Sequence, residues 1–231
     1  MRGGRQKYEV DKDLVQAFAG HGPCTYLLLA LIGTILVYPY AHGNAIGRVI
    51  LAAFYSLVLV GGAFAVGQNR RMLIAELGLA VLAIALLWAS ILTANEVLDR
   101  LAVVIFIFFL LLTIGEVLRY ILKRGPVTAD KLHGALASYI MIIFLFAFIY
   151  SVVESFTPGS FNFPQADATD PHAVFRLLYF SFTTLTTVGY GDIVPVTDQA
   201  RSFVIIEEFT GVFFVAILIA RLAGLYPQAS K

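Results

Sequence analysis

Residues 186–192 read TTVGYGD, and this polar, glycine-containing stretch lies in a chain of 231 residues that is 59% hydrophobic. Gly189 and Gly191 alternate with larger residues, so the backbone here can adopt conformations that a run of other L-residues resists. The stretch has neither helical nor strand periodicity. Irregular backbone at membrane depth is tolerated only where it is buried in protein or lines a water-filled cavity, so its role depends on its surroundings.

The rest of the chain holds six apolar segments, each long enough for a membrane-spanning helix of about 20 residues. They cover residues 24–40, 46–67, 72–94, 100–122, 132–154 and 201–225. A composition this apolar argues against a soluble domain, and a net charge of only +1 gives no sign of a nucleic-acid partner.

The longest connection joins the fifth and sixth segments and contains TTVGYGD. It starts with polar, proline-containing residues 155–171, which we expect to form an exposed turret. An apolar run of 14 residues follows at 172–185; it is too short to cross the bilayer and suits a re-entrant half-helix, with Asp170 as its N-cap and Pro171 at its start. The sequence therefore predicts an all-α membrane protein with six transmembrane helices, and a re-entrant helix and extended strand between helices five and six.

The lysines and arginines predict the orientation, because positive charge concentrates on the cytoplasmic side. With the N-terminus inside, twelve of the 16 basic residues lie at cytoplasmic ends, and four lie outside: Arg48, Arg100, Arg176 and Arg201. We expect both termini in the cytoplasm, residues 155–200 facing out, and, by analogy, a plasma-membrane location. Residues 1–22 form either a short amphipathic helix or a charged lead-in, and we expect no soluble regulatory domain.

The wider stretch YFSFTTLTTVGYGDIVPVT at 179–197 resembles the pore helix and filter of tetrameric potassium channels, and TVGYG at 187–191 matches their selectivity filter. The similarity extends through 201–223 as the inner helix, so roughly 132–225 resembles one pore module. The resemblance implies that K+ binds at the filter residues Thr187, Val188, Gly189, Tyr190 and Gly191, with carbonyl oxygens and the Thr187 hydroxyl replacing water. It also implies filter support from Thr186, Asp192, Glu154 and Thr183.

One chain supplies one filter strand, and four are needed to close a ring around an axial ion. We find no second copy in the sequence, so we expect a homotetramer surrounded by membrane lipids. The expected parts are a cytoplasmic segment at 1–22, a four-helix peripheral domain at 23–124, a pore domain at 125–226 and a short tail at 227–231.

The sixth segment contains the residues that could bend, line or close the pore. Gly211 lies where related channels often carry a hinge glycine, and a glycine that packs closely beside the pore helix is the competing interpretation. Candidates for the cavity lining recur every three to four residues, with core packing as the alternative: Val212, Val215, Ile219 and Ala223. Ile219 or Ala223 could form a hydrophobic gate.

Acidic residues near the expected filter have two interpretations. Glu154 resembles the acid that tethers the outer structure in related channels, and Glu207 or Glu208 either hydrogen-bonds behind the filter or lies solvated at the mouth. Thr183 stands where some bacterial channels have a glutamate that couples to the filter aspartate, so that carboxyl pair is absent here.

The fourth segment lacks the charges of a voltage sensor. Residues 101–118 contain no lysine or arginine, and a sensor needs several, so we expect weak voltage dependence. Glu76 and Glu116 are intramembrane acids that either pair with Arg70, Arg71 or Arg119 or act as a proton-sensitive element controlling the pore.

These observations favour a passive, potassium-selective channel. The alternatives are a weakly selective cation channel, a potassium-transport subunit, or a silent subunit that conducts only beside a partner. We find no nucleotide-binding loop, zinc-binding helix or nucleophile elbow, the four histidines lack metal-ligand spacing, and Cys24 is the single cysteine. The sequence therefore indicates neither an enzyme nor a cofactor, with K+ as the permeant ion.

Overall fold

The computed structural model describes residues 22–41, 45–65, 70–123, 128–163 and 173–223. The expected N-terminal amphipathic helix, the expected helix start at Asp170 and Pro171, and the C-terminal tail lie outside the described residues.

Six of the described helices are long and apolar enough to cross a membrane. They are α2 (Pro23–Ala41), α3 (Ala45–Ala65), α4 (Arg70–Thr93), α5 (Glu96–Leu122), α6 (Ala129–Phe156) and α8 (Asp198–Ala223). Their bounds lie within a few residues of the segments expected from the sequence. The prediction of an all-α integral membrane protein with six spanning helices is confirmed.

Three shorter elements lie between α6 and α8. The strand β1 (Phe161–Asn162) follows α6, the helix α7 (Ala173–Leu185) has 13 residues, and the strand β2 (Val194–Pro195) precedes α8. The two strands pair antiparallel, with Phe161 opposite Pro195. A helix of this length rises about 20 Å, so α7 cannot span the roughly 30 Å hydrocarbon core.

Helix starts follow the local sequence. Asn95 accepts the backbone N–H of Val97 at 2.9 Å and caps α5. Thr128 caps α6 by accepting the N–H of Lys131, and Thr197 accepts an N–H in the first turn of α8. Side-chain oxygens at these positions satisfy backbone donors that have no partner inside the helix.

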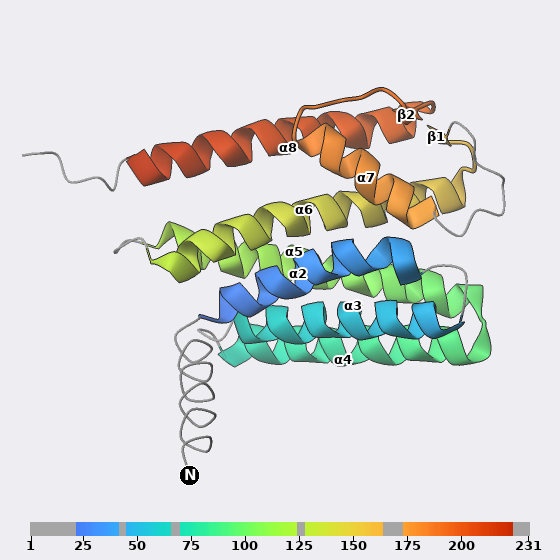
Figure 1. Ribbon diagram of the computed structural model, residues 1–231, viewed down its shortest axis with the longest axis horizontal. Coiled ribbons are helices and arrows are strands. Elements are labelled where there is room, and N and C mark those ends of the chain that lie inside the picture. Colours follow the sequence, from blue (N-terminus) through green and yellow to red (C-terminus); the bar gives the residue numbers. More distant parts are fainter. Residues whose placement is uncertain (1–21, 42–44, 66–69, 124–127, 164–172, 224–231) are drawn as a thin grey trace, which may run out of the picture.

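Helix α6 lies at the centre of the arrangement (Figure 1). It packs against α2 and α5 on one side and against α7 and α8 on the other. Within its most apolar stretch 61% of the residues are buried, whereas the corresponding share is 17% in both α4 and α8. Aromatic rings pack in both contacts. The ring centroids of Phe148 in α6 and Phe106 in α5 lie 5.1 Å apart, and those of Tyr150 in α6 and Phe180 in α7 lie 5.5 Å apart.

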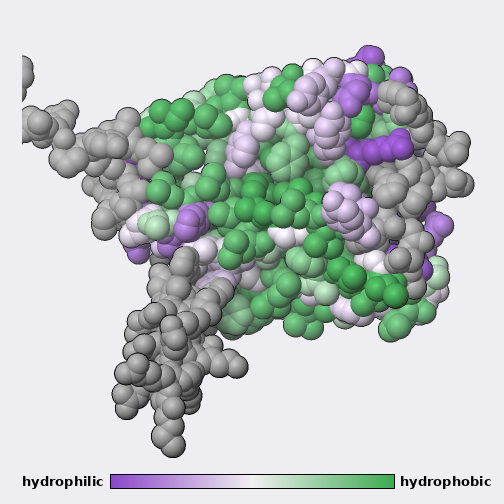
Figure 2. Space-filling model, in the orientation of Figure 1, coloured by the Kyte–Doolittle hydropathy of each residue, from purple (hydrophilic) through white to green (hydrophobic). Residues whose placement is uncertain are grey.

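The surface of the helices is mostly apolar. Figure 2 shows hydrophobic residues across the middle of the visible face and many of the hydrophilic residues near one end. Large apolar side chains such as Ile205, Phe209 and Ile219 of α8 are exposed. Contact between such faces and water is costly, so lipid or another protein chain must cover them.

The prediction of an exposed turret at 155–171 is wrong for Ser160 and Phe161, which are buried. The ring of Phe161 lies 5.0 Å from Tyr150 and 5.6 Å from Phe180, and the carbonyl of Ser160 accepts the N–H of Val196 at 2.8 Å. Packing and strand pairing with distant residues therefore fold this part of the connection onto the helices.

Candidate functional site

The 186–192 segment follows directly after α7. Figure 1 shows α7 running from the end of the molecule that carries β1 and β2 toward the middle, and the chain then returning to the same end. The C-terminus of α7, at Leu185, is therefore the point at which the segment begins. The apolar residues of α7 explain its position, because Leu177, Leu178 and Phe180 are buried.

Backbone N–H groups of the segment bind back to the last turn of α7. Thr187 donates to the Thr184 carbonyl at 3.0 Å, and Val188 and Gly189 donate to the Thr183 carbonyl at 2.9 and 3.0 Å. Across the described ranges, no hydrogen bond is accepted by a backbone oxygen of residues 186–191. The segment thus uses its donors within the protein and keeps its acceptors available.

The backbone of the segment is left-handed at every second residue. The φ angles are 60° at Thr187, 53° at Gly189 and 77° at Gly191. Glycine adopts this region at little cost, but a threonine there is uncommon and is strained by about 1–2 kcal/mol. Such strain persists when the surrounding structure enforces it, and it is concentrated at functional sites.

Side chains of the segment also contact α7, and the hydroxyl of Thr186 donates to the Phe182 carbonyl. The rings of Tyr190 and Tyr179 stack with centroids 6.4 Å apart. Desolvation and then the nearby carboxylate of Asp192 raise the pKa of the Tyr179 phenol. Thr183 contacts the segment through its carbonyl, while its hydroxyl bonds to Phe180 within α7.

Glu154 lies in the last turn of α6 and binds the connection between α6 and α7. Its carboxylate accepts the N–H of Gly159 at 2.7 Å and the N–H of Phe161 at 3.1 Å. Phe161 belongs to β1, which pairs with β2, and β2 follows the 186–192 segment. Glu154 is therefore linked to the end of the segment through two strands.

Glu207 of α8 is fully buried behind α7. Its carboxylate accepts hydrogen bonds from Ser181 of α7 and from Tyr150 of α6. The Ser181 hydroxyl also lies 2.9 Å from the Ile143 carbonyl, which is a second acceptor for its single proton. Of Glu207 and Glu208, it is Glu207 that forms this contact behind α7. Its partners Ser181 and Tyr150 were not identified from the sequence. A lone serine in an apolar half-helix was a signal that could have indicated Ser181.

Gly211 packs against the C-terminus of α7. A Cβ at this position would overlap the backbone oxygen of Leu185, which also accepts the hydroxyl of Tyr139 at 3.1 Å. Gly211 therefore packs closely beside α7, as the alternative to the hinge interpretation expected. Close packing of glycine against backbone is a recurrent way of joining membrane helices.

The expected cavity residues lie on another face of α8. Ala200, Val204, Glu207 and Gly211 form the buried face. Since successive residues turn by about 100°, Val212, Val215 and Ile219 lie about a quarter-turn away, and all three are exposed on the single chain. Ala223 is the last residue of α8, and its side chain lies outside the described residues.

The two intramembrane acids differ, and neither contacts the 186–192 segment. Glu116 pairs with Arg119, one of the partners expected for it. Glu76 is fully buried, and neither carboxylate oxygen has a hydrogen-bond partner among the described residues. The side chain of Arg70, another expected partner, is not among those that the structure describes. No group of three or more metal-ligating side chains occurs in the described ranges.

Comparisons with known proteins agree with the pattern of this region. A family model described as an ion channel matches residues 138–226, which hold most of α6, α7, the 186–192 segment and α8. A potassium channel protein of Paramecium bursaria Chlorella virus 1 is 36% identical over 81 residues, which cover 34% of this chain and 81% of the viral protein. No solved structure matches the chain.

Longer relatives share a smaller part of their length. Two-pore potassium channel 5 of Arabidopsis thaliana is 31% identical over 98 residues, covering 42% of this chain and 22% of the plant protein. The voltage-gated potassium channel Kch of Escherichia coli is 34% identical over 82 residues, covering 35% of this chain and 20% of the bacterial protein. The chain thus spans about a fifth of the length of these relatives.

All of these relatives are channels and not enzymes, and the viral protein is matched over most of its length. The sequence resemblance stated above is confirmed at the level of the family. With its six spanning helices and its ion-channel region at 138–226, the chain belongs to the potassium channel superfamily.

Proposed function

We propose that the chain is one subunit of a homotetrameric channel that conducts K+ passively and selectively through the 186–192 segment. The observation that supports this most strongly is that backbone N–H groups of the segment are hydrogen-bonded while its backbone oxygens are not. Four of its N–H groups, those of residues 186–189, bind to the carbonyls of α7, and the carbonyl oxygens of residues 186–191 accept no hydrogen bond within the described chain. A row of unused oxygens is what a dehydrated alkali ion requires.

The alternating handedness of the backbone supports the same role. In a regular strand successive carbonyls point to opposite sides, whereas alternation of left- and right-handed residues turns them to the same side. Positive φ at Thr187, Gly189 and Gly191 fits such an arrangement. The C-terminus of α7 adds the negative end of a helix dipole beside the segment, which favours a cation there.

The apolar side chains that one chain leaves uncovered support the proposed tetramer. Val188 is 52% exposed and Tyr190 is 71% exposed on the single chain, although both are large and apolar or aromatic. A closed ring of four identical strands would cover these side chains against neighbouring subunits and direct the oxygens to a common axis. The exposed residues Val212, Val215 and Ile219 would then line the cavity or meet the adjacent inner helix.

The remaining parts keep the division expected from the sequence. Residues 125–226 form the pore domain, and residues 23–124 form a peripheral domain that packs on α6 of the same chain through α2 and α5. Both termini lie in the cytoplasm, and the channel resides in the plasma membrane. Without basic residues at 101–118, the peripheral domain gives weak voltage dependence.

A flux experiment on the full chain tests this function. The purified protein is reconstituted in liposomes, and the reversal potential is measured with opposed K+ and Na+ gradients. We expect a potential that follows the K+ gradient. A potential midway between the two equilibrium values would favour the weakly selective cation channel, and absence of flux would favour a subunit that needs a partner. Cross-linking in the same membranes should give a tetramer as the largest product.

A further inference from the structure

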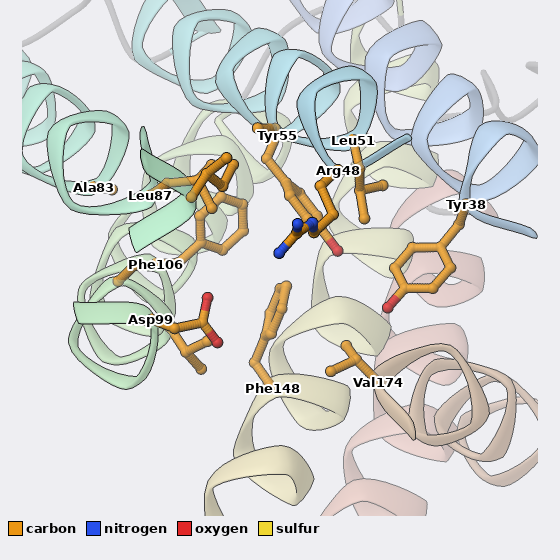
Figure 3. A pocket seen from close by; sticks show the side chains of 14 residues that line it. Tyr38, Arg48, Leu51, Tyr55, Ala83, Leu87, Asp99, Phe106, Phe148 and Val174 are labelled. Carbon is orange, nitrogen blue, oxygen red and sulfur yellow. The ribbon is translucent and has the colours of Figure 1, made fainter. Parts of the chain in front are cut away.

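A cavity of about 190 Å³ lies between the four-helix part and α7. It is found at the end of the molecule where α2 ends and where α3, α5 and α7 begin. Figure 3 shows the side chains that line it, among which four aromatic residues contribute much of the wall: Tyr38, Tyr55, Phe106 and Phe148. The cavity is distinct from the 186–192 segment, since no residue of that segment lines it.

Two opposite charges face this cavity. The guanidinium of Arg48, from α3, and the carboxylate of Asp99, from α5, point into it from different walls (Figure 3). Neither side chain forms an ion pair or a hydrogen bond with the described residues, although Glu96–Arg100 and Asp198–Arg201 pairs form at the same end of the molecule. Both side chains are exposed, so a ligand can reach them.

The chemistry of the walls fits a zwitterion. An ammonium group would be attracted to Asp99 and to the faces of the surrounding aromatic rings. A phosphate would be bound by Arg48, whose planar guanidinium matches phosphate oxygens in pairs. A molecule that carries both groups a few bonds apart would satisfy both charges at once, which neither a simple anion nor a simple cation does.

An apolar groove continues from the cavity. A second hollow of about 510 Å³ lies between α5, α6 and the start of α7, and it shares Asp99, Val103 and Val174 with the first. Its walls include apolar side chains such as Leu101 and Leu177. The groove lies along helices that cross the membrane, where acyl chains are the surrounding solvent. This continuity favours a lipid over a free zwitterion.

We propose that the cavity binds the head group of a zwitterionic phospholipid, with its ammonium at Asp99 and the aromatic rings, its phosphate at Arg48, and one acyl chain in the adjoining groove. The bound lipid connects the four-helix part to α7, because Val174 of α7 forms part of the cavity wall and Phe175 stacks on Tyr38 of α2 at 5.0 Å. This inference is independent of ion conduction by the 186–192 segment.

The experiment measures lipid retention by the full chain, not flux. Delipidated protein in mild detergent is offered phosphatidylethanolamine, phosphatidylglycerol or soluble glycerophosphoethanolamine, and bound molecules are counted by native mass spectrometry. We expect about one phosphatidylethanolamine per chain, and retention of phosphatidylglycerol lower by about tenfold, which corresponds to about 1.4 kcal/mol. Asp99→Asn should lower retention of the zwitterionic lipid alone, whereas Arg48→Gln should lower retention of both lipids.

Matched controls separate binding from folding. Asp198→Asn and Arg201→Gln remove the same two kinds of charge from a pair at the start of α8, in which the guanidinium and the carboxylate lie 3.3 Å apart. Neither Asp198 nor Arg201 lines either hollow, so both variants should retain lipid as the wild type does. Arg48→Lys and Asp99→Glu keep the charges and should retain most of the lipid. The proposal is overturned by equal retention of the two lipids in the wild type, by unchanged retention in Arg48→Gln and Asp99→Asn, or by soluble glycerophosphoethanolamine binding as tightly as the lipid.

Discussion

In the half of the molecule formed by α6, α7 and α8, the buried carboxylate of Glu207 accepts hydrogen bonds from two neighbouring elements. In the half formed by α2 to α5, the buried carboxylate of Glu76 has no hydrogen-bond partner among the described residues. The charges of Arg48 and Asp99 also face a cavity without forming a pair. The two halves therefore differ in whether their buried carboxylate is satisfied, although the Ser138 hydroxyl of α6 and the Arg221 Nε of α8 also lack a partner among the described residues.

The difference indicates which half requires a fixed geometry. A satisfied buried network holds its elements in one arrangement, because breaking it leaves a polar group without a partner. Such a network joins α8 to α7, the helix that leads into the 186–192 segment. The ion site that we propose there would require the carbonyl positions to be held closely. In the other half, the carboxylate of Glu76 and the charges that face the cavity are instead available to a proton or a ligand.

The largest expected effect is in the 186–192 segment, at Gly189. No atom lies within 4 Å of a Cβ placed there, but φ is 53°, which disfavours an L-residue by about 1–2 kcal/mol. In a tetramer the change occurs four times around one axis. We expect Gly189→Ala to reduce K+ flux in liposomes to background.

Gly115→Ala is the matched control for Gly189→Ala. Gly115 lies within the helix α5, and a methyl group added to it would meet no atom within 4 Å. Its flux should equal that of the wild type. Wild-type flux in Gly189→Ala would show that the segment does not line the conduction path.

Gly211→Ala should have the next largest effect. The added methyl group would overlap the backbone oxygen of Leu185, and backbone cannot move aside as a flexible side chain can. Overpacking of this kind costs about 1–3 kcal/mol and shifts the end of α7 that leads into the 186–192 segment. We expect a lower melting temperature together with reduced flux, whereas Gly78→Ala in α4, where space is open, should change neither. Reduced flux at an unchanged melting temperature would instead favour a hinge.

Glu207→Leu tests the buried network directly. The substitution leaves the Tyr150 hydroxyl without an acceptor, while Ser181 keeps its bond to the Ile143 carbonyl. One orphaned buried hydroxyl costs about 1–3 kcal/mol, which denaturant unfolding in micelles can measure. Adding Tyr150→Phe to this variant should recover part of the loss, because the orphaned group is then removed. Equal stability of Glu207→Leu and wild type would contradict the role of the network.

The parts of this structure that the sequence predicted correctly depend on local information. The six spans follow from runs of apolar residues, and the unusual backbone of the 186–192 segment follows from its alternating glycines. Burial of Phe161 could not be predicted in this way, because it depends on rings 11 and 19 residues away, those of Tyr150 and Phe180.

The same limit applies to the polar residues of the site. A glutamate inside an apolar helix does not reveal its partner, and Glu76 has none among the described residues. Glu207 finds its partners on two other elements, 26 and 57 residues away in sequence. Gly211 likewise could be interpreted as a hinge or as a packing contact until the position of Leu185 was known. Long-range packing decides each of these cases.

Glu76→Leu should change stability in the opposite direction from Glu207→Leu. The carboxylate of Glu76 is buried without a hydrogen-bond partner among the described residues, and burial of an unsatisfied polar group costs about 1–3 kcal/mol. A leucine of similar size removes that cost, so denaturant unfolding should show a gain of about 1 kcal/mol. Glu116→Leu, which breaks the pair with Arg119, should give a small loss. A clear loss in Glu76→Leu would mean that this acid has a partner in the assembled protein.

The smallest expected effect concerns the membrane potential. Each charge that crosses the field contributes about 2.3 kcal/mol per 100 mV, and residues 101–118 of α5 contribute none. Arg119 follows this stretch in the last turn of α5 and pairs with Glu116, so we expect it to stay at the end of the helix. In planar bilayers we therefore expect open probability to change little with voltage, and Arg119→Gln to leave that slope as it is. A steep dependence of open probability on voltage, equivalent to several elementary charges, would require the four-helix half to move as a sensor. Glu76, Arg48 and Asp99, which lack partners among the described residues, would then be the groups that change contacts between two positions of that half.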